Sequence, residues 1–169
     1  MKRRDIVIGV IVLAAAVGVY FYGQKLKKDN QPKVPQTLSS QDNTEQNIEN
    51  KFNLQIPDDL EKAILKDRAG GNSQAIATRK WSDGQFSFDI LADLPEPESG
   101  FLYQGFLIRG NEGEDGYSVI SVGQFTIAKG GWLIHYESSN NYSDYTKVVV
   151  SLQQALSERP EKPVLQGSF

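Results

Sequence analysis

The stretch QFSFDILADLPEPESGFLYQGFLI, residues 85–108, contains two apolar runs separated by a turn rich in proline and glutamate. In the first run Phe86, Phe88 and Ile90 alternate with polar residues, which predicts a strand with one buried face and one wet face. The second run, residues 101–109, carries apolar side chains on both faces and predicts a central strand covered on both sides. Within it, Gly105 predicts a β-bulge or a close backbone approach.

Similar short apolar runs recur roughly every ten residues from residue 52 onward, separated by Gly, Asn, Asp and Pro. This spacing is typical of all-β proteins, and we expect an antiparallel β-sandwich over residues 52–169. Residues 57–68 could also begin a helix, but the Gly-Gly-Asn that follows favours a strand for their second half. The predicted strands are residues 63–68, 74–81, 85–93, 101–109, 118–128, 132–137, 146–152 and 163–168.

The N-terminal region has the character of a membrane anchor. Three basic residues precede an uncharged run, residues 6–22, whose length is within the range of about 17 to 25 residues that cross a bilayer as a helix. We therefore predict a cytoplasmic tail at residues 1–5 and a transmembrane helix at residues 6–23. Lysines follow the run as well, so the orientation stays open; we expect the C-terminal domain outside the cytoplasm. The alternatives are a cleaved signal peptide, with small residues at 14–16, and a buried helix of a soluble protein.

Residues 24–51 are rich in Gln, Asn and Ser with balanced charges, which predicts a flexible, disordered linker. The whole chain has 169 residues and a formal net charge of -3. The chain has no excess of basic residues to bind phosphate groups, so nucleic acid is not expected as a partner. The absence of cysteine excludes disulfides, thiolate nucleophiles and zinc sites that need sulfur.

The sequence contains few residues that could support catalysis. His135 is the only histidine and lies between apolar neighbours, where an outward-facing strand residue is the simplest interpretation. We therefore expect no enzymatic activity, no cofactor and no metal. Four aromatic residues outside the central stretch form a possible interaction surface for a protein or for sugar rings. They are Trp81, Trp132, Tyr142 and Tyr145.

Four motifs follow one another along the chain: residues 83–108, VGQF at residues 122–125, YTKVVVSLQ at residues 145–153 and PEKPVLQGSF at residues 160–169. In this order they resemble the extracytoplasmic C-terminal domain of the anti-sigma-K factor family, over residues 63–169. The resemblance implies a β-sandwich in which the residues at family positions have structural roles. These residues are Leu94, Pro95, Gly100, Tyr103, Phe106, Gly123, Phe125, Val150, Pro160, Leu165 and Gly167.

Complete members of that family have a cytoplasmic helical domain that holds the sigma factor, and here MKRRD stands in its place. The resemblance therefore implies a membrane-anchored sensory, regulatory or protein-interaction module of the cell envelope, with an envelope or membrane protein as its partner. The alternative is a carbohydrate- or cell-wall-binding adhesion module. The adhesion module predicts that Trp81 or Trp132 is exposed, whereas the regulatory module predicts that both are buried.

Overall fold

The computed structural model describes residues 43–169. The predicted cytoplasmic tail, the predicted transmembrane helix and the predicted linker as far as residue 42 lie outside these residues. From residue 43 onward, no helix is both long enough and apolar enough to cross a membrane.

One helix and nine strands make up the described part of the chain. The helix is α2, Thr44–Phe52. The strands are β1 (Glu61–Asp67), β2 (Gln74–Ser82), β3 (Gln85–Asp93), β4 (Leu102–Arg109), β5 (Ser118–Gln124), β6 (Thr126–Ala128), β7 (Gly131–Ser138), β8 (Lys147–Gln153) and β9 (Lys162–Ser168). The predicted strands are confirmed to within two residues at each end, with one exception. The predicted strand at residues 118–128 is divided at Phe125, which separates β5 from β6.

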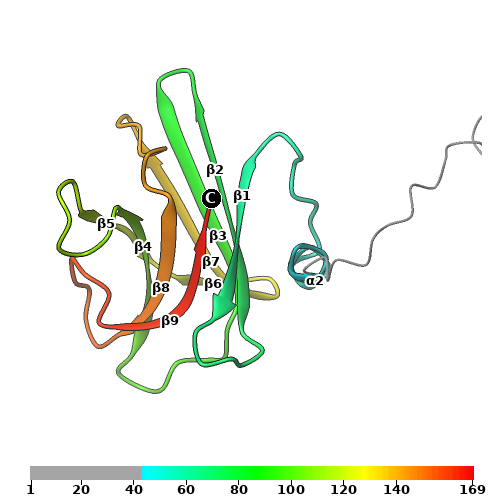
Figure 1. Cartoon of the computed structure of the whole chain (residues 1–169). Helices are drawn as coiled ribbons and strands as arrows, with labels where there is room; N and C mark the ends of the chain where they lie inside the picture. The colour runs from blue at the N-terminus through cyan, green and yellow to red at the C-terminus, as the bar shows by residue number, and fades with distance from the viewer. Residues whose placement is uncertain (1–42) are drawn as a thin grey trace, which may run out of the picture. The chain divides into compact units, whose positions relative to one another are not determined.

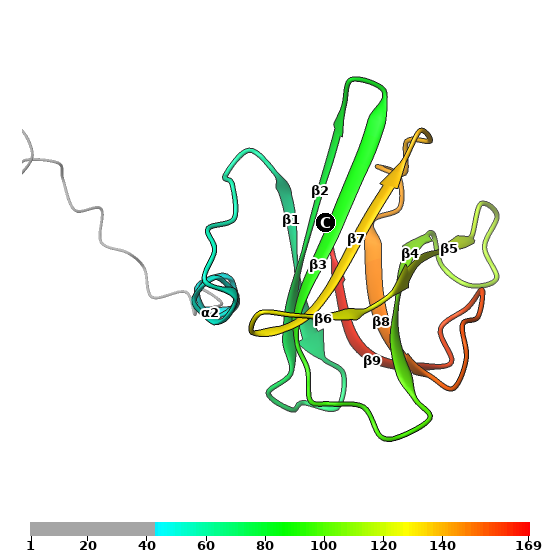
Figure 2. The same ribbon diagram turned by 180° about the vertical axis from the view of Figure 1, so that it is seen from behind.

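All nine strands belong to one antiparallel sheet with the order β5-β4-β8-β9-β1-β2-β3-β7-β6. The antiparallel all-β prediction is therefore confirmed. β5 and β6 lie at the two ends of this order, yet Phe125 alone separates them in the sequence. A sheet whose edge strands are consecutive in the chain has to curl until its two edges approach each other. The result is a nearly closed, barrel-like sheet (Figures 1 and 2).

The main core fills the inside of the curled sheet. Phe86, Phe88 and Ile90 of β3 are fully buried there, as the alternation in the sequence predicts. Gly105 of β4 faces them across the core: a Cβ placed on it would lie 2.7 Å from Cδ1 of Ile134 and 3.2 Å from Cδ1 of Ile90. The pairing of β4 with β5 also shifts register between Gly105 and Phe106. The predicted irregularity at this glycine is therefore confirmed, and the atoms that approach it closely belong to side chains and not to the backbone.

β4 is covered on both faces, which the sequence also predicts. Tyr103 and Leu107 belong to the main core. Phe106 and Ile108 point the other way and form a separate outer cluster with Val149 of β8. Because neither face of β4 is open to solvent, the apolar and aromatic residues of the run at residues 101–109 have structural roles in this domain.

The helix α2 corrects the prediction that residues 24–51 form a linker, because its residues 44–51 fall within that range. Ile48 and Phe52 lie one turn apart and are buried against the outer face of the sheet with Ile76 of β2. The carboxylate of Glu45 also pairs with Lys62 of β1 at 2.6 Å. Two apolar residues at helical spacing are enough to fix this short helix on the sheet.

Candidate functional site

The outer face of the sheet, on the side that carries α2, has an apolar row across four strands. The register places Ile64, Ile76, Leu91 and Leu133 side by side on β1, β2, β3 and β7. α2 packs on this row through Ile48 and Phe52. Ile76, Leu91 and Leu133 of the row form the floor of an open groove of about 400 Å³.

Two segments from distant parts of the sequence form the walls of the groove. One wall is the chain that leaves α2, with Leu54, Ile56 and Leu60. The other is the end of β6 and the turn to β7, with Ala128 and Lys129. Figure 2 shows this turn reaching toward α2.

A close contact between backbones closes one end of the groove. A Cβ placed on Gly130, in the β6–β7 turn, would lie 2.0 Å from the carbonyl oxygen of Lys51 in α2. Gly130 also has a φ of 92°, a conformation that favours glycine. Only glycine therefore lets the turn and the helix meet without a shift of the backbone.

Hydrogen bonds and ion pairs hold the first wall in place. The Oε1 atom of Glu49 accepts a hydrogen bond of 2.7 Å from the backbone N–H of Ile56, which folds the chain back along α2. Lys51, in the last turn of α2, pairs with Asp93 at the end of β3. Further along the wall, Asp59 pairs with Lys80 of β2 at 2.6 Å, and this interaction lowers the pKa of Asp59. The groove is thus bounded by fixed elements, a property of ligand sites in general.

A polar row lies next to the apolar floor. The register aligns Thr78, Asp89 and His135, and the first two line the groove. The Nδ1 atom of His135 lies 2.7 Å from a carboxylate oxygen of Asp89, and Nε2 lies 3.6 Å from Glu137. The hydrogen bond to Asp89 raises the pKa of His135, since both carboxylates favour the imidazolium form. His135 is exposed on the outer face, as predicted for an outward-facing strand residue.

The four aromatic residues of the predicted interaction surface do not form one surface. Trp81, near the end of β2, is 40% exposed. Trp132 is half-buried against Tyr103, and its indole N–H donates a hydrogen bond of 3.1 Å to the carbonyl oxygen of Leu94. Tyr142 and Tyr145 pack edge to face inside the domain. Of the two tryptophans, therefore, only Trp81 is exposed, as the adhesion module predicts, and the prediction of the regulatory module that both are buried is wrong for Trp81.

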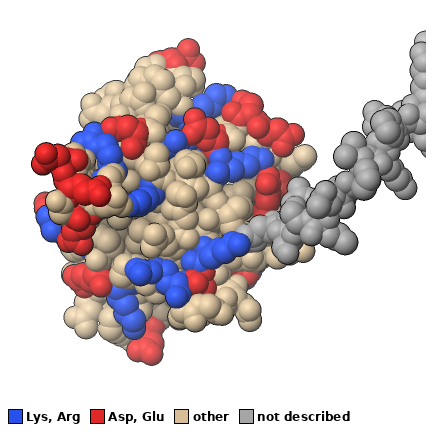
Figure 3. Space-filling model, in the orientation of Figure 1, with Lys and Arg blue, Asp and Glu red and all other residues tan. Residues whose placement is uncertain are grey.

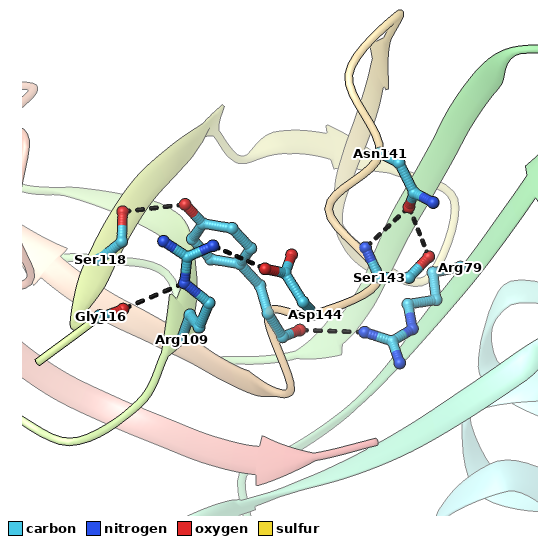
Figure 4. A network of polar contacts seen from close by, with 8 residues as sticks. Arg79, Arg109, Gly116, Ser118, Asn141, Ser143 and Asp144 are labelled. Atoms are coloured by element: carbon cyan, nitrogen blue, oxygen red, sulfur yellow. Dashed lines mark hydrogen bonds and ion pairs between the residues drawn. The ribbon is translucent and has the colours of Figure 1, made fainter.

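Figure 4 shows a polar network that includes Arg79, Arg109, Ser118 and Asp144, and the residue that is bonded to both Arg79 and Ser118 is Tyr145. Its hydroxyl donates to Ser118 at 2.8 Å, and its carbonyl oxygen accepts a hydrogen bond of 2.9 Å from Arg79, which is itself buried. Arg109 lies over the tyrosine ring and pairs with Asp144 at 2.6 Å. The hydroxyl and the carbonyl oxygen of Tyr145 both form hydrogen bonds within the domain, so the network is structural.

Most residues at the positions shared with the anti-sigma-K resemblance are placed as structural residues would be. The apolar members are buried: Leu94, Tyr103, Phe106, Phe125, Val150 and Leu165. Gly100 and Gly123 have positive φ, and a Cβ on Gly167 would lie 2.2 Å from the carbonyl oxygen of Ile64. Pro95 is exposed and Pro160 is half-buried.

The electrostatic character of the domain is mixed. Figure 3 shows basic and acidic side chains interspersed over the face that it draws, without a field of one sign. Among residues 43–169, no group of three or more His, Asp or Glu side chains is placed to hold a metal ion.

Comparisons with known proteins identify no relative of this chain. No family model, no curated protein and no solved structure matches it.

Sequence reasoning missed the groove. In the sequence, the floor residue Leu91 shares one face of β3 with Ser87, Asp89 and Asp93, which indicates a polar face open to water. Its walls come from residues 54–60 and 128–129, and no local pattern joins segments so far apart. The signal that was present is the helical spacing of Ile48 and Phe52 within an otherwise polar segment, because it indicates a helix that has to pack on something apolar.

Proposed function

We propose that the domain is a non-enzymatic binding module that holds an apolar segment of a partner protein in the groove between residues 54–60 and the β6–β7 turn. The observation that carries the proposal is an open, apolar groove on a domain whose interior is otherwise closely packed. Leu54, which lines the groove, is 40% exposed. Exposed apolar surface around a concave site favours a protein partner.

The proposed setting of this module is the outer side of the cytoplasmic membrane. The support is the uncharged run at residues 6–22 with basic residues on both sides, which suits an N-terminal anchor. The ordered motifs at residues 83–169 support a regulatory role like that of the anti-sigma-K factor C-terminal domain, with a membrane or envelope protein as the partner. The two halves of the curled sheet, facing each other across one core, suit the sandwich description of that domain.

Site-specific photocrosslinking in cells tests the groove as the binding site. A photoreactive residue placed at Leu54 of the full-length chain should capture the partner. The matched control is the same residue at Leu156, an exposed leucine on the loop between β8 and β9 that does not line the groove. Equal capture from both positions, or capture from Leu156 alone, would rule out the groove as the binding site.

A second candidate function is carbohydrate or cell-wall binding. The exposed Trp81 favours it, because sugar rings stack on accessible aromatic side chains. Asp83, Gln85 and Glu137 line a polar hollow beyond the end of β2 and supply hydrogen-bonding groups. This function predicts that retention on purified cell-wall glycan is lost in Trp81→Ala and unchanged in Leu54→Ala, the reverse of the result expected for a protein partner.

A further inference from the structure

The two ends of the groove carry opposite charges. Lys129 lines the groove at the β6–β7 turn and makes no ion pair with any residue of the described part of the chain. Asp89 lines the groove further along the sheet, with Glu137 on the neighbouring strand. The ends therefore differ in the charge that they offer to a bound segment.

The acidic end keeps a net negative charge whether or not His135 is protonated. One imidazole lies between two carboxylates, Asp89 and Glu137, so even the imidazolium form compensates only one of them. Two lysines on the same face have acidic partners of their own: Lys62 pairs with Glu45 and Asp58, and Lys80 pairs with Asp59. Within residues 43–169, these two lysines are therefore not left to neutralise the acidic end.

The distance between the ends suits a short extended peptide. Gly131, two residues after Lys129, and His135, paired with Asp89, are four residues apart on β7, or about 13 Å along a strand. Leu91 and Leu133 form the apolar floor between them. An extended segment of the same length would place its apolar side chains on this floor and its two ends over the two charged regions.

We infer that the groove selects an apolar peptide segment with a basic residue at one end, lying over Asp89 and Glu137, and an acidic group at the other end, lying at Lys129. This inference rests on the proposed function and adds the chemistry of the partner. The charge pairs are at the rim, so they contribute to selectivity and orientation more than to affinity.

Synthetic peptides test the inference on the purified full-length chain. One fluorescent peptide has a leucine and valine core with lysine at one end and glutamate at the other, and a matched peptide has glutamine at both ends. The charged peptide is made in two versions, one with lysine at its N-terminal end and one with lysine at its C-terminal end. At low salt we expect one direction to bind about fivefold more tightly than the neutral peptide, as two weak surface charge pairs allow.

Variants show which charges are responsible. Asp89→Asn together with Glu137→Gln should remove most of the preference for the charged peptide, and so should Lys129→Gln, as measured by the ratio of the affinities for the charged and the neutral peptide. Asp115→Asn, in the exposed loop between β4 and β5, is the control that should change nothing. Equal binding of charged and neutral peptides overturns the inference but leaves the groove as a binding site. Failure of every peptide to bind overturns both.

Discussion

His135 and Asp89 form the polar contact with the clearest dependence on pH. Their hydrogen bond raises the pKa of His135 in the folded domain above its ordinary value of 6.5, which the unfolded chain keeps. A raised folded pKa means that protonation favours the folded state. The stabilisation is therefore complete below pH 6.5 and is lost as the pH rises through the folded pKa.

This loss of stability with rising pH gives the first prediction at the scale of single residues. The free energy of unfolding should fall as the pH rises from below 6.5 into the alkaline range, as measured by urea denaturation at each pH. Asp89→Asn removes the main cause of the raised pKa, so its stability should depend less on pH over this range. If the free energy of unfolding of Asp89→Asn falls with pH as steeply as that of the native chain, the role of this contact is contradicted.

Phe106 gives the second prediction, because its ring is fully buried in the outer cluster on β4. Phe106→Ala should lower the free energy of unfolding by about 3 to 5 kcal/mol through lost burial and the cavity left behind. Ile127→Ala, at a position that is 77% exposed, is the control and should stay within about 0.5 kcal/mol of the native chain. If urea denaturation gives similar losses in the free energy of unfolding for the two variants, the face of β4 that carries Phe106 is not closed to solvent.

At the scale of secondary-structure elements, α2 and the β6–β7 turn decide whether the groove exists. The chain that leaves the helix supplies one wall, and the C-terminal end of the helix meets the turn at Gly130. The interaction is local, with two buried apolar residues and surface ion pairs that contribute little individually. We therefore regard α2 as an element that can be loosened while the sheet stays folded.

Gly130→Ala tests this arrangement. The new methyl group would collide with the backbone of Lys51, so the end of α2 should move and the amides of residues 47–54 should exchange hydrogen faster. Gly113→Ala is a matched control, since Gly113 has a similar φ of 87° but nothing within 4 Å of the added Cβ. It carries the same backbone cost without the collision. Unchanged exchange in α2 of the Gly130 variant would contradict the contact.

The elements also explain which parts of the fold could be predicted from the sequence. β3 was located correctly because its alternation of Phe86, Phe88 and Ile90 with polar residues is a local signal. α2 was missed because polar residues dominate its composition, and its two buried side chains matter only once the sheet is in place. The break at Phe125 was missed because a buried aromatic residue in an apolar run gives no sign that the chain changes partner strand.

At the scale of the whole molecule, the groove results from the way the sheet curls. The outer face of β2, β3 and β7 is left without a second layer except where α2 covers it. No local pattern encodes this, because the floor is assembled from β2, β3 and β7 and the walls come from residues 54–60 and 128–129. The sequence could therefore predict an antiparallel β domain, but the candidate site required the tertiary arrangement.

The measurement that tests the central claim most directly is the yield of the Leu54 photocrosslink in a chain whose groove has been filled. Leu133→Trp places a larger side chain on the floor, and Ile127→Trp is the control at an exposed neighbouring position outside the groove lining. If the groove holds the partner, the crosslink should disappear in the Leu133 variant and persist in the Ile127 variant, with both thermal midpoints close to that of the native chain. A crosslink that persists at full yield in a folded Leu133 variant would contradict the account.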